Sequence, residues 1–253
     1  DEYEDETGVD TAGSSNETYD ATNDLYKPSG DSYIKLLLHC DGTDGSTTFT
    51  DEIGKTVTVY GNAQIDTAQS KFGGASGLFD GTGDYLSLAD SADWNFGTGD
   101  FTIDFWYYPI ALDGYRGIIG SDTAGGSGGG SWTIYTNGSG LIRLTNDEAV
   151  TDKVTSGNQT LTLNVWNHVS IIRKGTGSTD FNISINGTFG NAPASGNVIL
   201  DSQSTGIHIG KFYRTHNAYY INGYLDEVRI SKGIARWTTD FTPPTSAYSA
   251  TKA

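Results

Sequence analysis

The sequence predicts an all-β fold of two antiparallel sheets packed face to face, preceded by an irregular acidic extension. The chain of 253 residues has 34 glycines and 15 tyrosines but no methionine, so few stretches favour a long helix. From residue 33 onward, short apolar segments are separated by Gly, Asn, Asp and Ser at intervals of about 8 to 15 residues, which is typical of a sandwich or barrel. Apolar and polar residues alternate within several segments, as in 181–185 before the Asn186-Gly187 turn.

The expected strands follow one another from this point to near the end of the chain. They span residues 33–40, 55–61, 76–81, 84–89, 101–109, 117–122, 131–138, 141–146, 159–166, 167–175, 180–187, 206–212 and 223–231. A Gly/Ser-rich stretch at 123–131 interrupts them and is expected to be a surface loop.

The net charge of −16 is distributed unevenly along the chain. Residues 1–32 hold ten acidic side chains and one lysine, with too little apolar surface for a core. We therefore expect an acidic extension over 1–32 that is disordered or ordered by a partner, one sandwich domain over 33–245 and a tail over 246–253. The acidic excess disfavours nucleic acid, and without an apolar run of about 18 residues we expect no membrane insertion. The single Cys40 excludes an intrachain disulfide.

The acidic pair in "GYLDEVRI" (223–230) is the first candidate site. In a regular strand, Asp226 would share a face with Val228 and Ile230, while Glu227 would lie on the opposite face with Arg229. The two carboxylates then could not act together, and Glu227 would form an exposed charge pair with Arg229. Asp226, on an apolar face, would need a partner.

Asp41, which follows the first expected strand, could bind a metal ion together with Asp226. Ca²⁺ binds carboxylate and backbone carbonyl oxygens together, and an Asp beside irregular backbone supplies both. The alternative is that Asp41 caps a turn and Asp226 accepts backbone N–H groups. The residues alone leave both interpretations open.

A second candidate site is the segment "KFYRTHNAYYINGY" (211–224), which is more aromatic and polar than a core strand requires. Glycan sites combine aromatic rings with polar side chains, but tyrosines can equally cover the edge of a sandwich. Side chains on both sides of the Gly/Ser-rich loop could form the rim of such a site. The candidate glycan-binding residues are Tyr115, Arg116, Trp132, Tyr213, Arg214, His216, Asn217 and Tyr219.

Several segments in order resemble the laminin-G-like jelly-roll domains of the concanavalin A-like lectin/glucanase superfamily. They are "YIKLLLHCDGTDGSTTFTDEIGKTVTVYGNAQI", "KFGGASGLFDGTGDYLSLADSADWNFGTGDFTIDFWYYP", "WNHVSIIRKG", "DFNISINGT" and "GYLDEVRISKGIARWTTDFTPPT". The resemblance covers about residues 33–245 and implies a two-sheet antiparallel jelly-roll sandwich. The ending "ARWTTDFTPPT" is similar to domains of bacteriophage virion proteins and marine bacterial surface proteins.

The resemblance also implies a ligand and a setting. The family's structural Ca²⁺ is held by aspartates that match Asp41 and Asp226, and this match favours the metal interpretation of the pair. Family members commonly bind glycans or proteins, so we expect an extracellular or virion module for attachment. Its expected partners are a glycan or other surface ligand and, through residues 1–32, neighbouring subunits. The alternative is a purely structural or decoration protein.

Hydrolysis is the least favoured hypothesis. The glucanase pattern E-x-D-x-x-E is absent, and the glutamates beyond residue 32 lie in three different segments. Asp100 and Asp104 could share a strand face, but Asp100 is expected to end a turn and Asp104 has no second acid beside it. Neither a Gly-x-Ser-x-Gly elbow nor a local group of histidines suggests a nucleophile. We therefore expect no catalytic residues.

Overall fold

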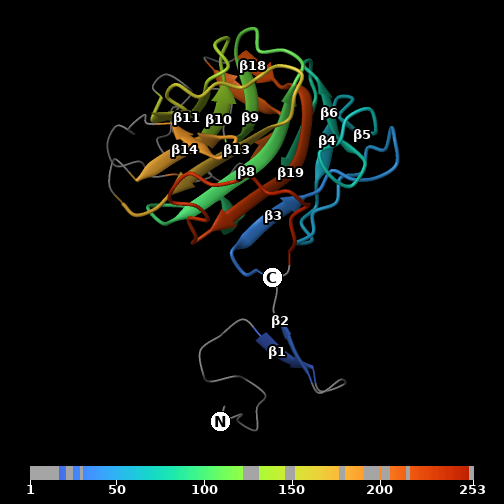
Figure 1. Ribbon diagram of the computed structural model, residues 1–253. Helices are drawn as coiled ribbons and strands as arrows, with labels where there is room; N and C mark the ends of the chain where they lie inside the picture. The colour runs from blue at the N-terminus through green and yellow to red at the C-terminus, as the bar shows by residue number, and fades with distance from the viewer. Residues whose placement is uncertain are drawn as a thin grey trace.

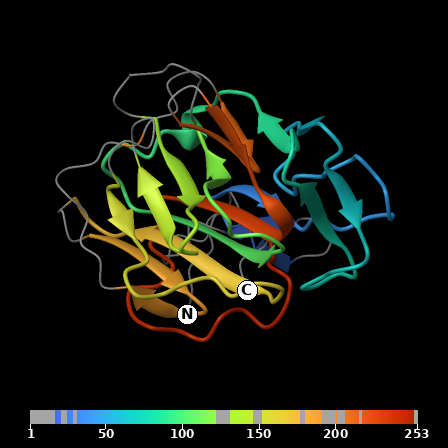
Figure 2. The same ribbon diagram turned by 90° about the horizontal axis from the view of Figure 1, so that it is seen from above.

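The computed structural model describes residues 17–20, 25–28, 31–121, 131–145, 152–176, 180–190, 200, 206–214 and 217–250. In this part of the chain two antiparallel sheets lie face to face, which confirms the predicted all-β sandwich (Figures 1 and 2). A single turn of 3₁₀ helix, η1 (Ala92–Trp94), is the helical element of the described residues.

One sheet has eight strands with the order β15-β14-β13-β8-β19-β6-β5, and β3 pairs with β19 outside this order. The strands are β3 (Ile34–Leu38), β5 (Gln64–Asp66), β6 (Ser76–Asp80), β8 (Phe101–Pro109), β13 (Asn167–Arg173), β14 (Phe181–Ile185), β15 (Thr188–Gly190) and β19 (Asn222–Lys232). Strand β19 is the longest and pairs with β6, β8 and β3, so it joins both ends of the chain to the centre of the sheet (Figure 1).

The other sheet has seven strands with the order β12-β11-β10-β9-β16-β7-β4. They are β4 (Thr58–Tyr60), β7 (Tyr85–Leu88), β9 (Arg116–Gly120), β10 (Thr133–Thr136), β11 (Ile142–Thr145), β12 (Val154–Thr155) and β16 (Ile207–Ile209). Two further pairs form sheets of their own: β1 (Glu17–Asp20) with β2 (Leu25–Pro28), and β17 (Lys211–Arg214) with β18 (Asn217–Tyr220).

The hydrophobic core fills the space between the two large sheets. Strand β8 shows the alternation that builds it, because Phe105 and Tyr107 are fully buried in the core while Asp104 and Trp106 lie on the opposite face. The core also includes Trp132, which directly precedes β10 and whose indole N–H donates to the Trp94 carbonyl at 3.0 Å.

The expected strand over 159–166 is wrong. This stretch is an irregular connection, because the amide of buried Asn167 bonds the Thr162 N–H, the Thr162 carbonyl and the Val165 carbonyl. Those backbone groups are therefore not free to pair with a neighbouring strand. The short strands β5, β12 and β15 were not predicted, since segments of two or three residues carry too little periodicity to stand out. The segment that contains β17 and β18 was expected to be a hairpin or a long loop, and it is a hairpin.

The packed unit extends slightly beyond its predicted limits. Asp31 donates its N–H to the Ala250 carbonyl at 2.8 Å and accepts from the Arg236 guanidinium at 2.6 Å. Tyr248, within the predicted tail, is buried against Ile34 and Leu37. The expected surface loop at 123–131 falls almost wholly outside the described residues.

The β17–β18 hairpin lies across the outer face of the seven-stranded sheet, above β9. Gly117 of β9 makes this approach possible, because a Cβ there would overlap the backbone of Lys211 and Phe212. The Arg116 guanidinium holds the hairpin from the side by donating to the Tyr220 carbonyl at 3.3 Å. The close packing of the hairpin on β9 therefore requires a glycine at position 117.

We expect Gly117→Ala to lower the free energy of unfolding by about 1–3 kcal/mol, because the added methyl group must displace backbone rather than a flexible side chain. Urea unfolding measures the change. Gly99→Ala is the matched control, since its Cβ would meet only the Phe96 carbonyl oxygen, at 3.3 Å. Equal stability of wild type and Gly117→Ala would contradict the close hairpin contact.

Candidate functional site

A β-bulge in β19 determines where the acidic pair lies. Glu227 has a positive φ of 53°, and the pairing of β19 with β8 shifts register between Asp226 and Arg229. Asp226 pairs with Trp106 and Arg229 with Asp104, so both lie on the outer face of the eight-stranded sheet. The predicted alternation, with Asp226 on the face of Val228 and Ile230, is therefore wrong, because the bulge inserts one extra residue.

Glu227 is a buried structural residue. Its side chain is fully buried; one carboxylate oxygen lies 2.7 Å from His39 Nδ1, and the other accepts the Tyr248 N–H at 2.6 Å. The hydrogen bond to Glu227 raises the pKa of His39. The predicted exposed pair with Arg229 is wrong, because the bulge turns Glu227 toward the first and last segments of the domain.

Asp226 is also fully buried, and its carboxylate is half satisfied. Oδ2 accepts the N–H groups of Lys71 at 2.8 Å and Phe72 at 3.1 Å, which confirms that Asp226 accepts backbone hydrogen bonds. Oδ1 is buried and has no hydrogen-bond partner in the described part of the chain. Burial, together with the charges of Glu227 and Asp41, raises the pKa of Asp226 to about 7 despite the two N–H groups.

Asp41 lies against the same short segment that holds Asp226. A Cβ on Gly73 would overlap the Asp41 carboxylate, and partial burial raises the pKa of Asp41 although Ala75 donates a backbone hydrogen bond to it. Segment 71–75 thus contacts one aspartate from β19 and one that follows β3. Among the described residues no group of three or more His, Cys, Asp or Glu side chains could hold a metal ion. Further ligands to a cation there would have to come from elsewhere, such as backbone carbonyls.

Asp104, the acid considered for hydrolysis, belongs to a buried ion pair. Its carboxylate accepts two hydrogen bonds from the Arg229 guanidinium, at 3.0 and 2.9 Å. The Arg229 charge, aided by a contact with His168, overcomes burial and holds the pKa of Asp104 well below its ordinary value. A carboxyl group held ionised in this way is unsuited to donate a proton as a general acid.

The C-terminal segment 233–250 covers this ion pair, because two of its aromatic rings lie against Arg229. Arg229 lies 3.9 Å from the Tyr248 ring centroid and 5.9 Å from that of Trp237. The Tyr248 hydroxyl lies 3.0 Å from His168 Nε2. Removing Asp104 alone would leave a buried guanidinium unpaired, a change that costs about 3–5 kcal/mol in other proteins. Around this ion pair, the outer face of the sheet is therefore covered by the C-terminal segment.

The predicted glycan-binding residues lie in different parts of the structure and differ in burial. Trp132 is fully buried in the core, so its predicted place at the rim of a site is wrong. Tyr115 and Tyr219 pack with Tyr135 and Phe212 between the hairpin and the seven-stranded sheet, with Tyr135 and Phe212 stacked at 4.8 Å. Arg116 also bonds Asp113 at 2.5 Å.

The remaining predicted residues lie on the hairpin. Asn217 is exposed and pairs with Arg214 in the hairpin backbone. His216 and the Arg214 side chain lie outside the described structure. Tyr213 is half-buried and lies with Tyr220 of the same segment near Tyr60 and Tyr85, two tyrosines that the sequence did not single out.

This group, the tyrosine platform, comprises Tyr60, Tyr85, Tyr213 and Tyr220. Tyr60 and Tyr85 pair across β4 and β7, and their rings stack at 4.4 Å with the planes 1° apart. Tyr220 lies 6.4 Å from Tyr85, and burial with the neighbouring phenols raises the pKa of Tyr85. The segments "TVTVY" and "DYLSL" each place a tyrosine at a strand end, but only the register reveals that they meet.

Lys211 brings a positive charge to the tyrosine platform. Its ammonium lies 3.6 Å from the Tyr85 ring centroid and 4.9 Å from that of Tyr213. His208 lies beside Tyr85 at 5.5 Å, and burial together with Lys211 lowers its pKa to about 4. At neutral pH the site therefore combines stacked phenol rings, one cation and an uncharged imidazole.

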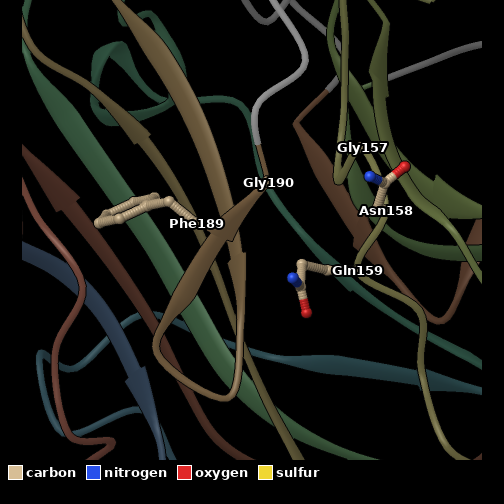
Figure 3. Close-up of a pocket in the computed structure, with 5 residues that line it drawn as sticks. All are labelled: Gly157, Asn158, Gln159, Phe189 and Gly190. Atoms are coloured by element: carbon tan, nitrogen blue, oxygen red, sulfur yellow. The ribbon is translucent and has the colours of Figure 1, made fainter.

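A small polar hollow lies where the edges of the two sheets approach one another. It has a volume of about 120 Å³ and is lined by Gly157, Asn158, Gln159, Phe189 and Gly190. Figure 3 shows the Phe189 ring turned away from the two amide side chains. The hollow thus offers amide groups without an aromatic surface to stack on.

Comparison with known proteins places this arrangement in a family. Residues 80–236 match the laminin-G model of the concanavalin A-like lectin/glucanases superfamily. The chain belongs to this superfamily. The match includes Asp226 and most of the tyrosine platform, whereas Asp41 and Tyr60 precede it. A search of curated proteins found no match.

Solved structures of toxin binding domains share the fold. The binding domain of Paraclostridial Mosquitocidal Protein 1 has a TM-score of 0.58 and 17% identity, over 80% of this chain and 49% of that one. The binding domain of Botulinum Neurotoxin DC in complex with SialylT has a TM-score of 0.54 and 17% identity, over 80% and 49%. Its complex with rat synaptotagmin II has a TM-score of 0.52 and 16% identity, over 81% and 50%. The chain thus spans about half the length of these domains.

Within the described ranges, no helix combines the length and the apolar character needed to cross a bilayer.

Proposed function

We propose that this chain is a non-catalytic glycan-binding module, used for attachment by a virion or cell-surface protein in the extracellular space. The observation that carries the proposal is the tyrosine platform on the outer face of the seven-stranded sheet. Tyr60 is 43% exposed although its ring is stacked on Tyr85, so an aromatic surface is held rigid and open to solvent.

This surface suits a sugar ring. The apolar face of a pyranose stacks on aromatic rings, while phenol hydroxyl groups can bond the sugar hydroxyls. The stacking of Tyr60 on Tyr85 and the contact of Lys211 with Tyr85 and Tyr213 hold the rings in place before binding. Less conformational entropy is then lost when the ligand binds.

The comparisons support a binding role. The binding domain of Botulinum Neurotoxin DC was solved in complex with SialylT and, in a second structure, with rat synaptotagmin II, so a domain that shares this fold binds both a glycan and a protein. The ionised, buried Asp104 supports the non-catalytic part of the proposal. The acidic extension, in which β1 pairs with β2, is proposed to contact neighbouring subunits of the assembly.

We expect Tyr60→Ala and Tyr213→Ala each to weaken glycan binding about tenfold, since each removes one ring of the stacking surface. A glycan array identifies a ligand, and calorimetry with that ligand measures the affinity. Tyr33→Ala is the matched control, because Tyr33 is similarly exposed at 40% but precedes β3 of the other sheet. A wild type that is silent on the array, or equal affinity for all variants, would contradict the proposal.

We further propose that Asp41 and Asp226 hold a structural Ca²⁺. The buried Asp226 Oδ1 without a partner fits this role, because a hard cation would satisfy it. The absence of a side chain at Gly73 lets the Asp41 carboxylate lie against segment 71–75, where the Ala75 N–H donates to it. When bound, the ion would supply positive charge that links the end of β3, this segment and β19.

We expect Ca²⁺ at about 100 times its Kd to raise the wild-type Tm by about 5 °C or more at pH 8. Without Ca²⁺, the raised pKa of Asp226 means that stability falls as the pH rises from about 4 through about 7, so the gain is larger at pH 8 than at pH 5. Thermal unfolding in CaCl₂ and in chelator measures both effects.

Asp226→Asn should abolish the Ca²⁺-dependent gain and be no less stable than wild type in chelator at pH 8, because it removes a buried anion. The control is Asp240→Asn, which alters an exposed carboxylate that accepts the Phe189 N–H at 3.0 Å. The same Tm in CaCl₂ and chelator at pH 8 would refute the calcium site.

A further inference from the structure

Two neighbouring loops expose aliphatic side chains at one end of the sandwich. Ile110 follows β8 and is 43% exposed, while Leu163 and Val165 precede β13 and are each 45% exposed. The Asn164 N–H donates to the Pro109 carbonyl at 2.9 Å, which holds the loops side by side. We call Ile110, Leu163 and Val165 the apolar tip.

Aromatic side chains lie behind the apolar tip and are less exposed than it. Trp166 and Tyr108 are half-buried, with ring centroids 5.6 Å apart, and Tyr224 lies 5.9 Å from Tyr108 at 9% exposure. Among the apolar side chains here, the most exposed are therefore aliphatic, and Trp and Tyr lie behind them.

The loop at 162–166 is rigid, and much of its backbone is satisfied internally. The buried Asn167 amide accepts the Thr162 N–H at 3.0 Å and donates to the carbonyls of Thr162 and Val165, both at 2.9 Å. With the Asn164 N–H bonded to Pro109, these groups need no water. Satisfied backbone groups lower the cost of moving a loop from water into an apolar medium.

The two segments that form the apolar tip carry no formal charge, and the first charge after Ile110 is the exposed Asp113, which pairs with Arg116. Residues 105–112 and 154–172 contain no Asp, Glu, Lys or Arg, although such residues make up 18% of the chain. A partner held by ion pairs is therefore a poor match for this surface. The surface is instead suited to contact with an uncharged apolar phase.

We propose that the apolar tip inserts shallowly into the surface of a zwitterionic lipid bilayer. Aliphatic side chains outermost with Trp and Tyr behind them match the order from hydrocarbon to interface. Protein-binding hot spots instead favour Trp, Tyr and Arg at the centre and are poor in Leu and Val. The net charge of −16 disfavours anionic lipid. The proposal revises the expectation of no membrane insertion, because a shallow apolar tip needs no spanning segment.

The test is vesicle flotation of the full chain with phosphatidylcholine vesicles that carry no glycan, so its outcome is independent of the tyrosine platform. Wild type should bind at millimolar lipid, and Leu163→Asp and Val165→Asp should each weaken binding about tenfold or more, because each places a charge in the apolar layer. Thr98→Asp adds the same charge at an exposed position at the opposite end of β8 and should bind like wild type.

A second measurement tests the depth of insertion. Lipids brominated on the upper acyl chain should quench the tryptophan fluorescence of wild type more than that of Trp166→Phe.

Several outcomes would overturn the proposal. In the first, wild type fails to float with the vesicles. In the second, equal fractions of wild type, Leu163→Asp and Thr98→Asp float with them. A third outcome comes from sedimentation velocity without lipid, which measures whether the chain self-associates. If wild type self-associates, Leu163→Asp is monomeric and neither binds vesicles, the apolar tip is an interface between copies of the chain and the lipid proposal is wrong. Thermal unfolding confirms that each variant is folded.

Discussion

The arrangement of the site depends on one extra residue in the central strand β19. The bulge at Glu227 lets Leu225 and Val228 both enter the core, while Asp226 and Arg229 both point to the outer face. Glu227 itself bonds His39 after β3 and the backbone of Tyr248. A single irregularity thus ties both ends of the domain to its centre and allows two carboxylates that are adjacent in sequence to be buried on different sides of the strand.

The outer faces of the two sheets are used in different ways. The eight-stranded sheet buries the Asp104–Arg229 pair beneath the C-terminal segment, so its polar groups serve the stability of the fold. The seven-stranded sheet carries a hairpin over β9 and leaves the Tyr60–Tyr85 stack open. This division makes the seven-stranded sheet the better surface for a ligand, while Ca²⁺ would act on the other sheet as a structural ion.

The sequence predicts the sheets better than the sites. Apolar segments separated by turn residues identified long strands such as β8 and β13, although nearly every residue of both strands is buried. The β19 bulge was not predictable, since no Gly or Pro marks Glu227, and every face assignment around it changed as a result. Trp132 appeared to be a surface residue because it follows a Gly/Ser-rich loop, yet it is core. The tyrosine platform joins residues 60 to 220, and only strand register brings them together.

The central claim is that the open tyrosine stack on the seven-stranded sheet receives a glycan. The most direct measurement is NMR of the tyrosine ring signals during titration with a glycan identified on the array. The account predicts that the signals of Tyr60, Tyr85, Tyr213 and Tyr220 shift together and saturate, while those of Tyr33 and buried Tyr107 stay in place. Unchanged ring signals at the tyrosine platform, with shifts instead near Asn158 and Gln159, would contradict it.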